Sequence, residues 1–271
     1  MTPRVAERNP SAEPPAIDLA GLELARLTPD QVVDHLFDGL AEGVGGWVIT
    51  ANVDYLRRCV ADPAVRRLFA GASLVVADGV PLLWAARLQG TPLPDRVAGA
   101  DLVWLLAERA AGEGRSLFLL GGNQGVADEA ARRLVERWPS LRIAGTASPR
   151  VSSDPTDAEL APILRDLRRA GPDLVYVALG APKEERLIAA LRSDLPRAWW
   201  IGVGVGLSFA TGDVRRAPRW MQRAGVEWLH RLLQEPRRLA RRYLGQDLLF
   251  TLRLLLSSWR RGRHSNGSGG S

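Results

Sequence analysis

Short apolar runs alternate with helix-like segments along most of the chain. Each run is apolar nearly throughout, and the segment after it repeats apolar residues every three or four positions. Strands that lack polar alternation are typical of a parallel sheet covered by helices on both faces. The pattern therefore predicts an α/β protein with a Rossmann-like, mainly parallel sheet. The predicted strands cover residues 47–50, 73–78, 116–122, 173–180 and 199–206, and residues 142–149 form a further candidate.

The composition divides the chain into four parts. Residues 1–17 are rich in proline, alanine and charge and predict a disordered lead, whereas residues 18–213 carry the alternating pattern of the α/β core. Residues 214–257 are basic and helix-like, and they predict an appendage on that core. Residues 258–271 end in glycine and serine, so we expect a flexible tail there.

Small, polar and ionisable residues stand at the ends of the predicted strands. Ligands of open parallel sheets bind in the crevice outside the carboxyl ends of the strands, so these residues are expected to converge on one site. The alternative for each glycine is that it only allows the chain to turn. The residues are Thr50, Asn52, Asp78, Gly121, Gly122, Gly180, Gly204 and Gly206.

The segment GGNQG at 121–125 ends a predicted strand and opens a predicted helix. Backbone N–H groups at such a helix start can receive a phosphate or a nucleotide hydroxyl. The spacing differs from GxGxxG, and no acidic residue clearly ends a second strand at the distance that dinucleotide binding requires. An NAD(P) oxidoreductase therefore rests on this segment alone.

Asp78 and Arg96 each have a chemical and a structural interpretation. A carboxylate at a strand end suits a general base that acts on a hydroxyl, but an aspartate shortly before Pro81 also suits a helix cap. Arg96 lies in a loop-like stretch, where it could grip a diphosphate or pair with Asp95 or Asp101 at the surface. The sequence leaves both choices open.

Glu184 and Glu185 come just past another predicted strand, at the first turn of a helix. The helix dipole stabilises carboxylates there, so both residues are compatible with a plain helix start. Lys183 beside them is the only lysine of the chain, and a loop lysine is normally solvated.

Positive charge is concentrated near the C-terminus. Residues 215–263 contain thirteen arginines and three carboxylates, a local net charge of +10. Because the net charge of the whole chain is +6, residues 1–214 carry a net charge of about −4. A polyanion or an anionic surface is therefore expected at this end. A nucleic-acid-binding arm is one interpretation, although the chain has no recognised nucleic-acid motif.

Pro236 is expected to divide this basic segment into two helices, the first of which ends near Glu235. In the second helix, Arg238 shares a face with Arg241 and Arg242. In the first, apolar residues recur every four positions and predict a packing face. That face consists of Trp220, Ala224, Trp228 and Leu232.

The composition excludes several kinds of site. Cys59 is the only cysteine, so neither an internal disulfide nor a cysteine-based metal site can form. The three histidines have no ligand spacing, and D-x-D, GxSxG, HExxH and P-loop motifs are absent. No apolar run approaches the ~20 residues that span a bilayer, and the first residues lack the apolar core of a signal peptide. We expect a cytosolic protein that can lie on a membrane without crossing it.

Six motifs stand near the predicted strand ends and in the basic segment. They are T-A-N-V-D at 50–54, A-D-G-V-P at 77–81, R-V-A-G-A-D at 96–101, F-L-L-G-G at 118–122, G-A-P-K-E-E at 180–185 and R-A-P-R-W-M-Q-R-x-G-x-E-W-L-x-R-L-x-Q-E-P-R-R at 216–238. Taken together, they resemble the WecG/TagA/CpsF glycosyltransferases over roughly residues 20–245.

The resemblance implies an inverting hexosyltransferase that needs no metal or other cofactor. Members transfer an N-acetylmannosamine-type sugar, or in some branches glucose or another hexose, from a UDP-sugar to a polyprenyl-diphosphate-linked sugar. They build wall teichoic acid linkage units, enterobacterial common antigen, or capsular and exopolysaccharide. The implied location is cytoplasmic and peripheral, on the inner face of the cell membrane, with no nucleic-acid partner. Exposed apolar faces around the appendage are compatible with a homo-oligomer.

The resemblance also assigns roles to residues. Asp78 matches the proposed base that deprotonates the acceptor hydroxyl. Thr50 and Asn52 match residues that line the same pocket, and Arg96 matches the arginine that binds the acceptor or the diphosphate. The same set of substrate-binding residues includes Asp101, Gly121, Gly122, Gly180 and Glu184.

Two features of the resemblance concern charge. Arg231, Arg238 and Arg241 match basic positions of the appendage, which is thought to close over the site and to neutralise the leaving UDP. The family often has P-K-Q-E where this chain has Glu184 in place of the glutamine. A carboxylate can accept a hydrogen bond from a sugar hydroxyl but cannot donate one unless it is protonated, so the identity of the sugar stays open.

The apolar segment LLFTLRLLLSSW follows the basic positions of the appendage. It suits an interfacial helix on an anionic membrane surface. The alternative is an amphipathic helix buried against the core or a second subunit.

Overall fold

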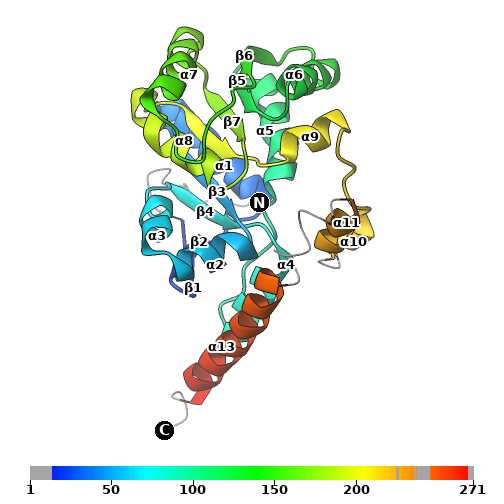
Figure 1. The fold of residues 1–271 in the computed structure, drawn as a ribbon. Coiled ribbons are helices and arrows are strands. Elements are labelled where there is room, and N and C mark those ends of the chain that lie inside the picture. Colours follow the sequence, from blue (N-terminus) through cyan, green and yellow to red (C-terminus); the bar gives the residue numbers. More distant parts are fainter. Residues whose placement is uncertain (1–13, 224–225, 235, 237–244, 268–271) are drawn as a thin grey trace, which may run out of the picture.

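A computed structural model of the chain describes residues 14–223, 226–234, 236 and 245–267. Its centre is a six-stranded sheet in which every neighbouring pair is parallel, with the order β4-β3-β8-β7-β5-β6. All six strands predicted from the sequence are present, so the predicted fold class is confirmed (Figure 1). The strands are β3 (Gly46–Ala51), β4 (Leu74–Ala77), β5 (Ser116–Gly121), β6 (Arg142–Ala147), β7 (Leu174–Ala178) and β8 (Trp199–Gly202).

Helices cover both faces of the sheet, because successive strand residues point to opposite sides and both sides are apolar. On β3, for example, Val48 belongs to one buried cluster, whereas Trp47 and Ile49 belong to the other. The first face is covered by α1 (Pro29–Glu42), α5 (Gly99–Glu113), α6 (Val126–Arg137) and α9 (Gly206–Thr211). The second is covered by α2 (Val53–Ala61), α3 (Pro63–Phe69), α4 (Val80–Gln89), α7 (Asp157–Ala170) and α8 (Lys183–Leu191).

An N-terminal hairpin was not predicted. Strands β1 (Ala16–Leu19) and β2 (Leu22–Ala25) pair antiparallel, and their alternate residues Ile17, Leu19 and Leu24 are buried in the second cluster. The expected disordered lead to residue 17 is therefore wrong at its end, since the first strand begins at Ala16. The short I-x-L and L-x-L alternation around an Ala-Gly turn was the available signal.

The C-terminal region contains α10 (Arg219–Arg223), α11 (Glu227–Gln234) and α13 (Leu248–Gly267). Helix α13 lies along α4 and extends beyond the core (Figure 1). A flexible tail was expected from residue 258, but the chain is helical as far as Gly267. Ser258 is fully buried, so this part of the helix packs against the rest of the protein. A Cβ atom at Gly262 would lie 2.3 Å from the Leu88 carbonyl oxygen, so the two helices touch closely there. None of the described helices is long and apolar enough to cross a membrane.

The predicted packing face of the appendage is also wrong where the structure describes it. Helices α10 and α11 are separate, and the side chain of Trp220 is 66% exposed rather than packed. A four-residue repeat stays on one face only within a continuous helix, so the break between the two helices disperses it. The expected break at Pro236, together with Arg238 and Arg241, involves residues outside the described ranges, as does the side chain of Arg231.

Candidate active site

The carboxyl ends of four strands of the sheet bring the predicted site residues to one edge. Asp78 follows β4, Thr50 and Asn52 stand at the end of β3, Gly180 follows β7, and Gly121 ends β5. Because all these strands run in the same direction, their carboxyl ends lie at the same edge of the sheet, where ligands of open parallel sheets bind. That these residues form one substrate site stays a prediction.

Asp78 does not cap the helix that follows it. Helix α4 starts at Val80, its N-cap is Gly79, and no side chain caps it. The capping interpretation is therefore wrong, and the carboxylate instead forms an ion pair with Arg96. Its side chain is 28% exposed.

Burial raises the pKa of Asp78 to about 6, although the Arg96 guanidinium acts to lower it. The neighbouring charges of Glu227 and Asp101 raise it further, and a hydrogen bond from the Gly99 amide lowers it. A carboxylate with this pKa is mostly ionised at neutral pH, yet it is basic enough to take up a proton during a reaction.

Asp78 belongs to a group of five charged side chains, which we call the ionic cluster. Arg96 Nη1 lies 3.1 Å from Glu227 Oε2 and 3.8 Å from Asp78 Oδ1, and Arg96 Nη2 lies 3.4 Å from Asp101 Oδ2. Arg216 Nη1 lies 2.5 Å from Asp101 Oδ1, and Arg216 Nε lies 3.7 Å from Glu227 Oε1. Arg96 therefore contacts Asp101, as its structural interpretation required, and also reaches the proposed base.

Two members of the ionic cluster, Arg216 and Glu227, were not singled out from the sequence. Both stand in the long C-terminal motif, in R-A-P-R-W and x-E-W, so the motif itself was the signal. They connect the start of the appendage to Arg96 and Asp101 of the core. The Nε and Nη2 atoms of Arg216 are buried without a hydrogen-bond acceptor among the described residues. Such donors are costly to leave unpaired, so they favour an additional anionic ligand.

Asn52 and Thr50 are partly occupied by structural contacts. The Asn52 side-chain oxygen caps α2 by accepting hydrogen bonds from the amides of Asp54 (3.0 Å) and Tyr55 (3.3 Å). Its NH2 group is the part that a ligand could contact. Thr50 Oγ1 lies 3.5 Å from the Gly202 carbonyl oxygen, and the residue is nearly buried. Any contact from Thr50 to a substrate therefore comes from the floor of the crevice.

The three glycines at the strand ends, Gly121, Gly122 and Gly180, differ in the space around the missing side chain and in their backbone contacts. A Cβ atom at Gly121 would lie 2.6 Å from the Ala178 carbonyl oxygen, so the close approach of β5 and β7 explains this glycine without a ligand. Gly180 has φ 73° and open space around its missing Cβ atom. Gly122, with φ 76°, donates its N–H to Ala178. Gly180 is thus the glycine whose surroundings best fit a ligand close to the backbone.

Glu184 and Glu185 stand in the first turn of α8, as their interpretation as helix-start residues expected, but their side chains are buried. Both are only 2% exposed, and with Tyr55 they form a buried group that we call the acid cluster. The Tyr55 hydroxyl lies 3.1 Å from Glu184 Oε1 and also hydrogen-bonds to Glu185 Oε1. Glu184 Oε2 accepts hydrogen bonds from the amides of Leu179 (3.3 Å) and Gly180 (3.0 Å). This carboxyl therefore holds the loop after β7 in place.

The acid cluster requires an additional proton. Tyr55 has one hydroxyl proton, which cannot serve both carboxyl groups at once. Burial, together with the charge of Glu185, raises the pKa of Glu184 to about 8. A neutral Glu184 can donate to the Tyr55 oxygen while its other oxygen accepts from the two amides. In this form it has the hydrogen-bonding capacity of a glutamine.

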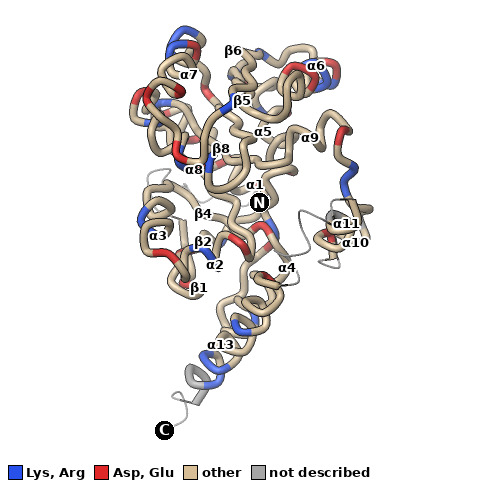
Figure 2. The backbone as a smooth tube through the Cα atoms, in the orientation of Figure 1, with Lys and Arg blue, Asp and Glu red and all other residues tan. Residues whose placement is uncertain are grey.

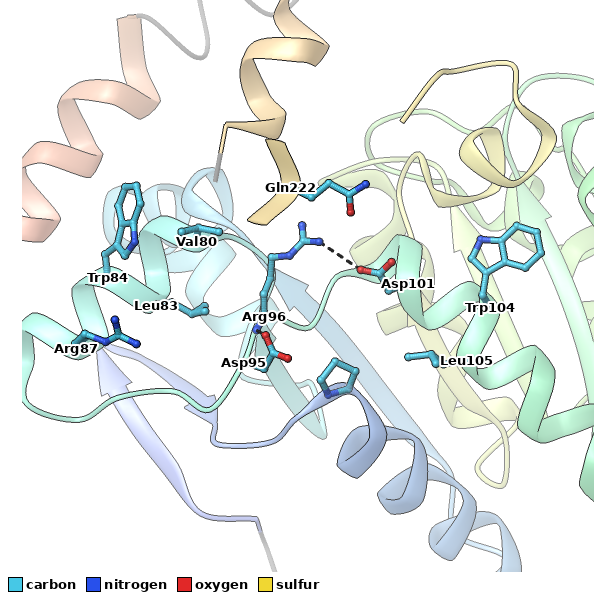
Figure 3. A pocket seen from close by; sticks show the side chains of 11 residues that line it. Val80, Leu83, Trp84, Arg87, Asp95, Arg96, Asp101, Trp104, Leu105 and Gln222 are labelled. Carbon is cyan, nitrogen blue, oxygen red and sulfur yellow. Dashed lines mark hydrogen bonds and ion pairs between the residues drawn. The ribbon is translucent and has the colours of Figure 1, made fainter. Parts of the chain in front are cut away.

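A cavity of about 650 Å³ is lined in part by Arg96. Figure 3 shows Arg96 in its middle, with side chains of α4 on one side, side chains of α5 on the other, and Gln222 of α10 across from them. The lining combines large apolar side chains with two arginines, two aspartates and Gln222. It is lined by Pro29, Val80, Leu83, Trp84, Arg87, Asp95, Arg96, Asp101, Trp104, Leu105 and Gln222.

This arrangement places an aspartate at a strand end of an α/β fold, with arginines beside it. A sequence model of the Glycosyl transferase WecG/TagA/CpsF family matches residues 17–264 of the 271. The chain belongs to this family, and it is a glycosyltransferase by that membership. The match continues past residue 245 and includes most of α13. Neither the nucleic-acid-binding interpretation nor the oxidoreductase interpretation has comparable support.

Proposed function

We propose that the protein is an inverting hexosyltransferase that acts on a polyprenyl-diphosphate-linked sugar in cell-surface polysaccharide or teichoic acid biosynthesis. The donor is a UDP-sugar, with an N-acetylmannosamine-type hexose as the first choice. One observation carries the proposal. Asp78 follows β4 without capping helix α4, its pKa is raised, and its Oδ1 atom lies 3.8 Å from Arg96 Nη1. A base next to a cation suits the deprotonation of a hydroxyl beside a diphosphate.

The reaction follows from these positions. Asp78 accepts the proton of the acceptor hydroxyl while the hydroxyl oxygen bonds to the anomeric carbon of the donor. The bond from that carbon to the UDP oxygen breaks on the opposite face, and the electron pair leaves with UDP. Inversion results from this single displacement.

Arginines are the proposed partners of the diphosphates. The ionic cluster has three carboxylates and two guanidinium groups, so it offers no excess positive charge by itself. The unpaired N–H groups of Arg216 support a direct contact to phosphate. Arg231, Arg238 and Arg241 remain the proposed additional cations, and Gly180 and the turn at 121–125 remain the proposed donor contacts.

Membrane association is proposed for α13. Its outer face exposes Leu249, Leu252, Leu256 and Trp259, at spacings of three and four residues. Figure 2 shows basic and no acidic positions along this helix. The opposite face packs on the core through Leu254 and Ser258, so the buried alternative accounts for only half of the helix. An exposed apolar stripe flanked by arginines suits an anionic membrane surface at the inner face of the cell membrane.

A donor screen tests the proposed function. The full-length protein is incubated with single UDP-sugars and a short-chain lipid-diphosphate-linked N-acetylglucosamine, and UDP release is measured. We expect one UDP-hexose to support release only when the acceptor is present, with an inverted linkage in the product. Release that does not depend on the acceptor, or a product with a retained configuration, would contradict the proposal.

A further inference from the structure

Arg96 connects the cavity to the proposed base, because it lines the cavity and pairs with Asp78. Arg96 Nη1 lies 3.8 Å from Asp78 Oδ1, and the same side chain lines the cavity. Asp78 itself does not line it. A molecule that reaches Asp78 with one end and contacts Arg96 in its middle would therefore extend its far end into the cavity.

The walls of the cavity indicate what that far end is. Val80, Leu83 and Trp84 of α4 face Trp104 and Leu105 of α5 across it (Figure 3). Large apolar side chains that line a concave site favour an apolar ligand, because binding removes both surfaces from water.

The charged residues of the cavity are mostly engaged with one another. Asp101 is bound by Arg216 and Arg96, and Asp95 accepts a hydrogen bond from the Arg96 backbone N–H at 2.7 Å. Arg87 lies on α4 at the rim, one turn after Leu83. The cationic groups thus lie at the centre and the rim, where a diphosphate would be, and the walls between them remain apolar.

We propose that this cavity binds the isoprenoid segment next to the diphosphate of the acceptor. The assignment rests on the proposed function for the identity of the acceptor, and it adds a subsite for the lipid chain. The sugar lies at Asp78, the diphosphate lies at Arg96, and the first isoprene units lie between α4 and α5.

The surface beyond the cavity supports this path. Trp84 is 46% exposed at the cavity, and Leu88, one turn further along α4, is 41% exposed. Helix α13 lies against α4 and exposes its own leucines on its outer face. A chain that leaves the cavity along α4 therefore enters the apolar surface that is proposed to contact the membrane.

The size of the cavity limits how much of the chain it can hold. About 650 Å³ is within the range of sites for small organic ligands, and it is too small for a whole polyprenyl chain. Affinity should rise with the first few isoprene units and then stay constant. Each fully buried methylene adds about fourfold in affinity, so three isoprene units should add at least tenfold even when burial is partial.

A binding experiment with the full-length protein tests the subsite without relying on turnover. Farnesyl diphosphate and inorganic diphosphate are titrated separately by calorimetry, in buffer without detergent. We expect farnesyl diphosphate to bind at least tenfold more tightly. Trp84→Ala should weaken farnesyl diphosphate at least fivefold and leave inorganic diphosphate within twofold, and Leu83→Asn should act in the same direction. Since Trp84 is partly exposed, we expect the variant to fold, which circular dichroism checks.

Val60→Ala is the matched control, because Val60 is as exposed as Trp84 (46%) but lies on α2 and does not line the cavity. It should leave both affinities within twofold. Equal affinities for the two ligands in the wild type would overturn the proposal. So would equal losses in the Trp84 and Val60 variants, which would indicate non-specific apolar association.

The results distinguish a failure of the proposed isoprenoid site from a failure of the proposed function. Binding of farnesyl diphosphate that depends on Trp84, together with no transfer from any UDP-sugar, would refute the proposed function and retain the isoprenoid site. Transfer to acceptors with and without a lipid chain at the same KM, unaffected by Trp84→Ala, would retain the function and refute the site.

Discussion

The ionic cluster and the acid cluster both contain carboxyl groups at the edge of the sheet where the strands end, but the partners of these groups differ. In the ionic cluster, Asp78, Asp101 and Glu227 share two guanidinium groups. In the acid cluster, Glu184 and Glu185 have a tyrosine between them, and no arginine or lysine forms an ion pair with them in the part of the chain that the structure describes.

The contrast explains why the carboxyl groups of the two clusters differ in pKa. A carboxyl group deep in the protein stays charged only when cations or N–H donors compensate for the lost water. Arg96 limits the rise in the pKa of Asp78, which reaches about 6, whereas the pKa of Glu184 reaches about 8. At neutral pH the first carboxyl can accept a proton and the second already has one.

The largest expected effect is that of Asp78→Asn, which removes the charge from the ionic cluster but keeps the shape of the side chain. Turnover should fall by about 10²–10⁴, the usual contribution of a general base. UDP binding should remain, because the amide still fits the same space. Single-turnover kinetics and a UDP titration measure the two effects. A variant that retains wild-type turnover would remove the distinction between the two clusters.

The next effect is that of Arg216→Ala. It removes the cation shared by Asp101 and Glu227, so two carboxylates lose a partner in a partly buried site. We expect the free energy of unfolding to fall by about 1–3 kcal/mol and kcat/KM to fall by at least tenfold. Thermal denaturation and steady-state kinetics measure these changes. Arg132→Ala on the exposed face of α6 is the control, and an equal loss there would show that the effect is not specific to the site.

The activity should depend on pH through Asp78. Because its pKa is about 6, the base is ionised above this value and becomes protonated below it. The rate should therefore fall about tenfold per unit as the pH decreases below about 6. A pH profile of kcat/KM tests this, and the acid limb should be absent from the residual activity of Asp78→Asn. A limb that persists in the variant would assign it to another group.

The smallest effect on activity is expected for Glu184→Gln, since glutamine has the hydrogen-bonding capacity of the protonated glutamate. Turnover at pH 7 should stay within about twofold. The stability of the wild type should decrease with pH between the unfolded pKa of 4.5 and the folded pKa of about 8, because the unfolded chain loses this proton first. The slope is about 1.4 kcal/mol per unit, and the variant should lose most of it.

Denaturant unfolding at several pH values measures that slope. Glu108→Gln, at an exposed position of α5, is the matched control and should leave the slope unchanged. A slope that is the same in wild type and Glu184→Gln would mean that Glu184 is ionised in the folded protein, and the two clusters would then be alike.

The strands of the core could be predicted because each is a local property of the sequence. A run such as WVIT or DLVYVALG is apolar on both faces, and only a covered parallel sheet satisfies such a run. Once the strands are parallel, the alignment of their carboxyl ends follows, so the approach of Asp78, Thr50 and Gly180 could also be expected. The hairpin at Ala16–Ala25 was missed because its strands are only four residues long.

The appendage was less predictable, because its structure depends on contacts with distant residues. A tail rich in arginine and glycine is helical to Gly267 because α4 supports it, and nothing within the tail encodes that support. The same applies to Arg216, whose partners Asp101 and Glu227 belong to different segments.

The sequence by itself determined the α/β class, the strand ends and the family motifs, because periodicity and spacing are written along the chain. Only the tertiary structure decided which ionisable groups are buried and which of them are neighbours. It placed Asp78 beside Arg96 and Glu184 beside Tyr55, and so gave the two carboxyl groups different pKa values. Protonation depends on burial and on neighbours that are distant in sequence, and these exist only after the chain has folded.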